Sequence, residues 1–165
     1  MGMSLLLTYV VVFVTGVAVS LILTPIVRSL ARRVGAMDLP NYRKVHTKPI
    51  PSLGGIAIIA AFATSVLIGL QMHPGPNIAL AHKLTGVFIG CLVLMSVGIY
   101  DDIKGVRPIA KLLGQIIAAI VLILYGFDIE KFTSPLSQTG SIAVPATVGV
   151  MLTVLWVVGL TNAVN

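Results

Sequence analysis

The segment SLLLTYVVVFVTGVAVSLILTPIV, residues 4–27, is an apolar run without a single charged side chain. A helix needs about 20 such residues to cross the hydrocarbon core of a bilayer, so this run predicts a membrane-spanning helix. A secretory signal has a shorter apolar core behind a basic segment, whereas no Lys or Arg precedes this run. We therefore expect a retained helix and not a cleaved leader.

The rest of the chain has the composition of a membrane protein. Of its 165 residues, 57% are hydrophobic and 10% are charged, and the mean hydropathy is +1.05, which is unlike a soluble domain. Eleven Lys and Arg against five Asp and Glu give a net charge of +6. The basic residues lie between apolar runs and aromatic residues are few, which disfavours nucleic-acid binding. Anionic headgroups and phosphorylated substrates are the partners that this charge favours.

Four more apolar segments complete the prediction of an all-α, polytopic membrane helix bundle with about five transmembrane helices. The expected spans are residues 4–27, 53–72, 84–100, 109–126 and 144–161. We expect residues 1–165 to form a single membrane domain, with cytoplasmic loops at about 28–52 and 101–108.

Loop charges orient the chain, because Lys and Arg concentrate on the cytoplasmic side of a membrane. The first loop holds six basic residues and the third holds two, whereas the second holds only Lys83 and the fourth only Lys131. This count predicts an amino terminus outside and a carboxyl terminus inside. Residues 28–52, residues 101–108 and the terminal NAVN would then share the cytoplasmic face of the plasma membrane.

Two adjacent acidic residues, Asp101 and Asp102, stand in the segment GIYDDIKGVRPIAKLLGQ, residues 98–115. Like charges repel, so such a pair favours a divalent cation, a basic neighbour or a shared proton. Mg²⁺ bound to a substrate diphosphate would meet this need. The pair could equally cap the helix that follows, because Asp favours helix starts. The pair by itself leaves both interpretations open.

The first loop is a further polar segment with candidate binding residues. The first loop, DLPNYRKVHTKPIPSLGG at residues 38–55, brings a carboxylate, an amide, two cations and an imidazole together within nine residues: Asp38, Asn41, Arg43, Lys44 and His46. This set indicates phosphate binding, whereas headgroup binding would not need the carboxylate.

In GLTNAVN, residues 159–165, two Asn three residues apart share a helix face. Amides at the end of an apolar span are costly unless they bond to something, and a helix cap is the alternative role.

Together these three segments resemble, in order and spacing, the polyprenyl-phosphate N-acetylhexosamine-1-phosphate transferase family. The first is most similar to the branch that serves teichoic-acid and enterobacterial-common-antigen synthesis. The resemblance implies that a lipid phosphate attacks the β-phosphorus of UDP-GlcNAc and releases UMP, which initiates cell-envelope glycan synthesis. It implies undecaprenyl phosphate and UDP-GlcNAc as partners in the membrane and Mg²⁺ as cofactor, with Mn²⁺ as a substitute. Homo-oligomerisation is left open.

The resemblance also implies roles for individual residues. Asp101 and Asp102 match the family's aspartate pair, expected in catalysis and metal binding, and Lys111, also expected in catalysis, matches the basic residue that follows the pair. The expected substrate-binding residues are Asp38, Asn41, Arg43, His46 and Asn162, and Asn165 is expected near the metal.

Members of this family are longer and have more spans, and their Asn-x-x-Asn-x-x-Asp element would continue beyond Asn165. We therefore expect this chain to be the amino-terminal half of such an enzyme. A catalytically inactive fragment, or a subunit completed by a second chain, is the alternative. A small transporter that uses carboxylates for a cation is disfavoured, because every acidic residue is expected in a loop or at an interface.

Overall fold

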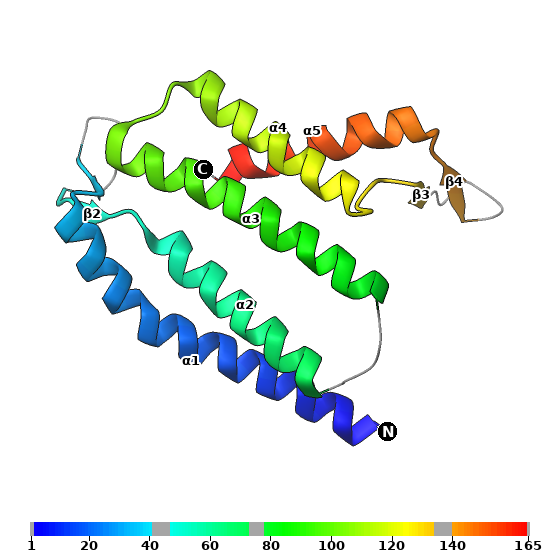
Figure 1. The fold of residues 1–165 in the computed structure, drawn as a ribbon, viewed down its shortest axis with the longest axis horizontal. Coiled ribbons are helices and arrows are strands. Elements are labelled where there is room, and N and C mark those ends of the chain that lie inside the picture. The colour runs from blue at the N-terminus through cyan, green and yellow to red at the C-terminus, as the bar shows by residue number, and fades with distance from the viewer. Residues whose placement is uncertain (1, 41–46, 73–77, 134–139, 165) are drawn as a thin grey trace. The chain divides into compact units, whose positions relative to one another are not determined.

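The computed structural model describes residues 2–40, 47–72, 78–133 and 140–164 and is mainly helical (Figure 1). The helices are α1 (Gly2–Val34), α2 (Gly54–Met72), α3 (Ile78–Lys104), α4 (Pro108–Leu124) and α5 (Ala146–Val164). Two short antiparallel hairpins lie between them: β1 (Met37–Asp38) pairs with β2 (Ile50–Pro51), and β3 (Lys131–Thr133) pairs with β4 (Ser141–Ala143). The prediction of an all-α membrane protein is confirmed.

Four of the described helices are long and apolar enough to cross a membrane, namely α2, α3, α5 and residues 5–34 of α1. Helix α4 matches the fourth expected span but has 17 residues, which gives a length of about 26 Å against a hydrocarbon core of about 30 Å. Large apolar side chains cover the helix surfaces: Phe13 is 72% exposed, Leu21 70% and Trp156 64%. Such surfaces suit lipid and not water, so the chain is a multi-pass membrane protein.

The first and third helices extend beyond the apolar runs that predicted them. Helix α1 continues through three arginines to Val34, and α3 continues through the acidic pair to Lys104. Arginines near a helix carboxyl end interact favourably with the helix dipole, so the polar extension of α1 stays helical. Gly35, with a φ of 77°, then ends the helix, and the N–H of Ala36 donates to the carbonyl oxygen of Ala31 at 3.0 Å.

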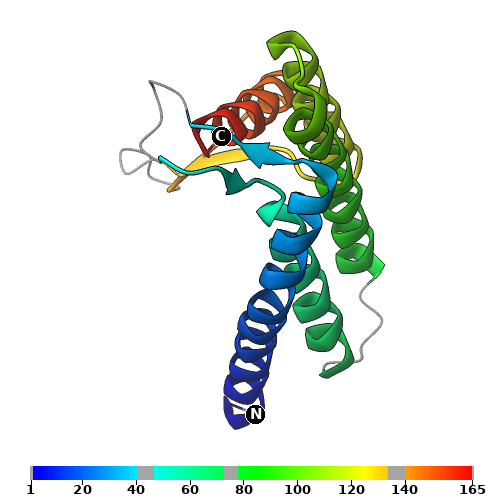
Figure 2. The same cartoon turned by 90° about the vertical axis from the view of Figure 1, so that its left-hand side faces the viewer.

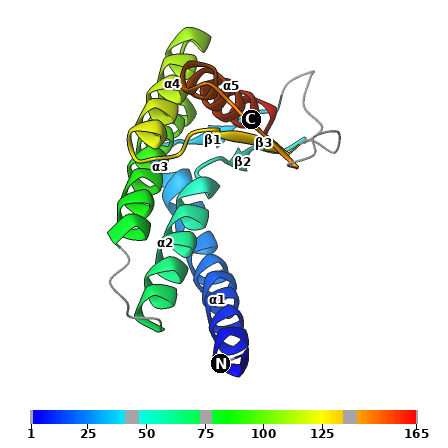
Figure 3. The same ribbon diagram turned by 90° about the vertical axis from the view of Figure 1, so that its right-hand side faces the viewer.

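The chain forms two compact units, Met1–Pro76 with Gly98–Gly105 and Asn77–Val97 with Val106–Asn165. In the first unit α1 and α2 run side by side, as Figures 1 and 3 show. Helix α2 buries the small residues Ala57, Ala61 and Ser65 along one face. A Cβ added to Gly16 of α1 would lie 2.9 Å from Oγ of Ser65. Small residues therefore set the close approach of these two helices.

A hydrophobic cluster joins the ends of several elements in the first unit. We call it the junction cluster; it consists of Val27, Ala31, Ala36, Leu53 and Ala57, with Leu23, Ile56 and Ile99 packed against it. The N–H and Oγ of Ser52 both donate to the carbonyl oxygen of Ala36, at 3.1 and 3.0 Å, which closes the β1–β2 hairpin onto the cluster. Figure 2 shows the two strands beside the end of α1. The end of α1, the start of α2 and the last two turns of α3 thus meet at one place.

In the second unit, glycines allow α3 and α4 to pack closely. A Cβ added to Gly114 of α4 would lie 2.7 Å from Cγ2 of Val97 in α3. The buried face of α4 consists of Gly114, Gln115, Ala118 and Ala119. The segment before the β3–β4 hairpin is tied to α5, because the N–H of Ile129 donates to Oγ1 of Thr153 at 3.1 Å.

Two glycines of α3 give a matched test of this packing. A Cβ on Gly86 would overlap Cβ of Tyr125 and lie 2.6 Å from its Cγ, whereas a Cβ on Gly98 would meet nothing within 4 Å. Because the root of the Tyr125 side chain cannot rotate away, Gly86→Ala is expected to destabilise the protein by about 1–3 kcal/mol. Gly98→Ala is expected to be neutral or slightly stabilising, since Ala favours helix. The two variants are compared by their unfolding temperatures in detergent. Equal unfolding temperatures would contradict the close packing of Gly86 against Tyr125.

Candidate functional site

The acidic pair lies on a helix and not in the expected loop. Asp101 and Asp102 occupy the last turn of α3, and both are half-buried. The carbonyl oxygen of Asp101 accepts a hydrogen bond at 2.8 Å from the N–H of Gly105, whose φ is 72°. The helix thus ends with a left-handed glycine just after the pair, and the two carboxylates are held on a regular helical backbone.

The position of the pair bears on the capping interpretation. Helix α4 has Arg107 as its N-cap residue and Pro108 at its first position, and it has no side-chain cap. Asp101 and Asp102 therefore do not cap α4. They stand instead at the carboxyl end of α3, where the helix dipole disfavours negative charge. A cation bound to the pair would offset this cost.

Cations gather at the same end of the first unit. Arg28, Arg32 and Arg33 lie in the last turns of α1, where all three are exposed. Asp38 is half-buried in β1, two residues after Ala36 of the junction cluster. Ile99, which packs against the same cluster, lies two residues before Asp101. The cluster therefore links the Asp38 hairpin and the acidic pair within the first unit.

Lys111 and Asn162 belong to the second unit. Lys111 is half-buried in the first turn of α4, and Asn162 is exposed near the end of α5. Nδ2 of Asn162 donates to Oε1 of Gln115 at 2.7 Å and to the carbonyl oxygen of Val158 at 2.8 Å. The prediction that an amide at this place must bond to something is confirmed for Asn162.

Gln115 is the residue of this region that sequence reasoning missed. It is only 7% exposed, within an otherwise apolar stretch of α4. The available signal was the cost of an amide in an apolar span, the same signal that singled out Asn162. The other predicted site residues, Asn41, Arg43, His46 and Asn165, lie outside the described residues.

The expected Mg²⁺ site can be compared with the metal-ligating side chains of the described residues. The described residues contain no group of three or more His, Cys, Asp or Glu side chains arranged to hold a metal ion. Asp101 and Asp102 offer two carboxylates, which are hard oxygen ligands. Mg²⁺ is commonly held by only one or two carboxylates, with substrate phosphates and water completing its coordination. The pair therefore fits a magnesium ion that binds together with a phosphorylated substrate.

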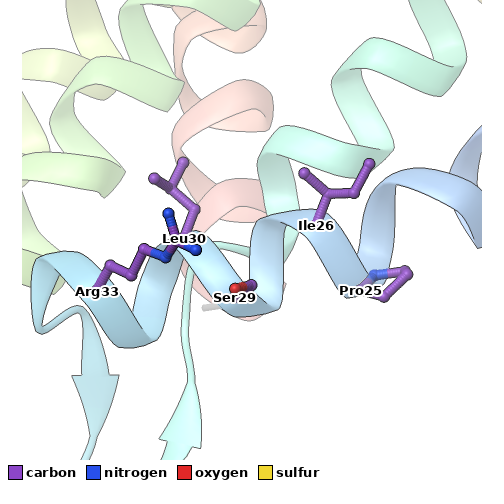
Figure 4. Close-up of a pocket in the computed structure, with 5 residues that line it drawn as sticks. All are labelled: Pro25, Ile26, Ser29, Leu30 and Arg33. Carbon is purple, nitrogen blue, oxygen red and sulfur yellow. The ribbon is translucent and has the colours of Figure 1, made fainter.

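A hollow of about 490 Å³ lies along α1 and is lined by Pro25, Ile26, Ser29, Leu30 and Arg33. Figure 4 shows Ile26 and Leu30 rising from the same side of the helix. Pro25 has no N–H to donate to the carbonyl oxygen of Leu21, so it interrupts the hydrogen bonds of α1 here. The hollow contains none of the predicted site residues, and we do not assign it to the site.

Comparison with known proteins gives matches along most of the chain. Residues 84–165 match the model of glycosyl transferase family 4. A probable undecaprenyl-phosphate N-acetylglucosaminyl 1-phosphate transferase of Bacillus subtilis is 34% identical over 160 residues, which cover 94% of this chain and 41% of the relative. A decaprenyl-phosphate N-acetylglucosaminephosphotransferase of Mycobacterium tuberculosis is 31% identical over 84% of this chain and 35% of the relative.

A shorter match supports the same assignment. An undecaprenyl-phosphate alpha-N-acetylglucosaminyl 1-phosphate transferase of Yersinia pestis is 39% identical over 67 residues, which cover 41% of this chain and 18% of the relative. No solved structure gives a significant match. The chain spans about two fifths of the length of the Bacillus relative. The match to the family model extends from residue 84 to residue 165, and the chain is a member of glycosyl transferase family 4.

Proposed function

We propose that this chain takes part in the transfer of GlcNAc-1-phosphate from UDP-GlcNAc to undecaprenyl phosphate. An oxygen of the lipid phosphate forms a bond to the β-phosphorus of UDP-GlcNAc. The bond from that phosphorus to the bridging oxygen breaks, and UMP leaves with the electron pair. The product, a polyprenyl-diphosphate-GlcNAc, stays in the membrane and begins an envelope glycan of the teichoic-acid or O-antigen type.

The observation that carries the proposal is the acidic pair at the end of α3, in the unit that also holds the three arginines of α1. Carboxylates and cations in one compact unit suit a reaction between two phosphorylated substrates, because phosphoryl transfer depends on positioning and charge stabilisation. The names of the relatives support the choice of a polyprenyl phosphate and an N-acetylglucosamine phosphate.

Within this proposal each residue has a stated task. Asp101 and Asp102, with Asn165, would hold Mg²⁺, which when bound neutralises charge on the diphosphate. Lys111 would stabilise negative charge on the transferring phosphoryl group. Asp38, Asn41, Arg43 and His46 would bind substrate phosphates from the first loop, and Asn162 would contact the nucleotide sugar.

The decisive assay measures UMP release from UDP-GlcNAc and undecaprenyl phosphate in the presence of Mg²⁺. One set of membranes contains the 165-residue chain, a second contains the chain extended by its downstream coding sequence, and a third contains neither. We expect Mg²⁺-dependent UMP release in the extended form. Activity of the 165-residue chain would mean that these helices hold a sufficient site. Absence of UMP release from both forms would contradict the proposal.

The proposal places the site on the cytoplasmic face of the plasma membrane, which thiol labelling can test. In a Cys91→Ala background, single cysteines replace Thr47, before β2, and Thr133, at the end of β3; both threonines are exposed. An impermeant thiol reagent is expected to label position 133 in intact cells and position 47 only after the membrane is opened. Labelling of position 47 in intact cells would contradict the assigned sidedness.

A further inference from the structure

The side-chain amide of Asn162 is held from two directions. Its Nδ2 donates to Oε1 of Gln115 at 2.7 Å and to the carbonyl oxygen of Val158 at 2.8 Å. Gln115 is almost fully buried at 7% exposure, whereas Asn162 is exposed. A buried side chain of α4 thus restrains an exposed side chain of α5.

These two contacts determine which atom of the Asn162 amide remains for a ligand. A backbone carbonyl can only accept hydrogen bonds, so the Asn162 atom beside the carbonyl of Val158 is the nitrogen. The same nitrogen faces Gln115, which must therefore present its oxygen. Both hydrogens of Nδ2 are then used within the chain. Oδ1, an acceptor, is the atom that can bind a substrate.

We propose that Gln115 is a positioning residue that orients Asn162 so that its Oδ1 accepts a hydrogen bond from the nucleotide sugar. This inference rests on the proposed function. An acceptor suits an N–H or hydroxyl group of the base or the sugars, and it does not suit a phosphate oxygen, which is itself an acceptor. Asn162 accordingly contacts the neutral part of the nucleotide sugar, and other residues hold its phosphates.

The test compares Gln115→Leu, Gln115→Glu and Gln71→Leu in the chain extended by its downstream sequence. Leu removes the acceptor for Nδ2, whereas Glu keeps an acceptor oxygen in either protonation state. Gln71 is an exposed glutamine near the end of α2 and serves as the matched control. Loss of one hydrogen bond is expected to raise KM for UDP-GlcNAc about 3- to 10-fold in Gln115→Leu, with kcat within about twofold.

Gln115→Glu and Gln71→Leu are expected to keep KM near the unmodified value. The double variant Gln115→Leu/Asn162→Ala is expected to be no worse than Asn162→Ala, because the first residue acts through the second. An unchanged KM in Gln115→Leu, or additive losses in the double variant, would overturn the proposal. A fall in kcat that Glu does not restore would indicate a structural role only.

Failure of the proposed function can be told apart from failure of this inference. If the unmodified extended chain releases no UMP, the proposed function fails. The contact between Gln115 and Asn162 is then tested by the unfolding temperatures of four proteins: the unmodified chain, Gln115→Leu, Asn162→Ala and the double variant. Coupled effects of Gln115→Leu and Asn162→Ala support the restraint on the amide. Additive effects overturn it.

Discussion

Asp101→Asn and Asp102→Asn are each expected to lower the rate of UMP release by about 10²- to 10³-fold or more, because each removes a negative charge where the proposed magnesium binds. The reaction brings two phosphorylated substrates together, and their mutual repulsion must be offset by bound cations. An Asn at either position keeps the size of the side chain, removes the charge and replaces one acceptor oxygen by a donor NH2 group. The measurement is Mg²⁺-dependent UMP release by the chain extended with its downstream sequence.

A matched control is available in the same chain. Asp128 is an exposed acidic residue after α4, and Asp128→Asn is expected to keep UMP release within about twofold of the unmodified rate, as is usual for surface substitutions. Amounts of protein in the membrane are compared for all three variants, so that poor insertion is not mistaken for lost chemistry. Near-normal turnover in both Asp101→Asn and Asp102→Asn would remove the central support for the proposed function.

The place of the pair adds a second measurable expectation. Carboxylates at the carboxyl end of α3 meet the negative end of the helix dipole, so their neutralisation should not cost stability through this interaction. Through the helix dipole, Asp101→Asn and Asp102→Asn are expected to leave the unfolding temperature unchanged or to raise it. Lost activity with retained stability would identify the pair as functional.

Hydropathy predicted the helices well but not their ends. All five apolar segments are helical over most of their length, because the bilayer requires helices wherever long apolar runs cross it. The same measure ended the first helix at residue 27, whereas α1 continues to Val34. Hydropathy reports where the bilayer ends, and the helix ends where Gly35 adopts a positive φ. For the same reason the acidic pair was expected in a loop and lies on α3.

The sequence pointed to those candidate site residues that belong to a local motif. The pair Asp101 and Asp102 and the amide of Asn162 stand out from their apolar surroundings, so the sequence pointed to them. Gln115 acquires its role only from its contact with Asn162, which lies 47 residues further along the chain. The β1–β2 hairpin was also missed, since its strands have two residues each and depend on the junction cluster and not on a local pattern.

Lys111→Met is expected to lower the rate of UMP release by about 10²- to 10³-fold, because it removes a positive charge that would stabilise the transferring phosphoryl group. Lys111 stands in the first turn of α4 and is half-buried. A cation there faces the positive end of the helix dipole, just as the acidic pair faces the negative end of α3. Asp101, Asp102 and Lys111 thus each lie at a helix end where the helix dipole disfavours their charge.

This arrangement makes the Lys111 prediction specific. Lys104 is an exposed cation at the favourable carboxyl end of α3, so Lys104→Met serves as the matched control and is expected to keep UMP release within about threefold. Lys111→Arg keeps the charge and is expected to retain more activity than Lys111→Met. Through the helix dipole, Lys111→Met is expected to leave the unfolding temperature unchanged or to raise it. If Lys111→Met and Lys104→Met lose activity equally, Lys111 is only an interfacial anchor, and the charge on the phosphoryl group must be met by other residues.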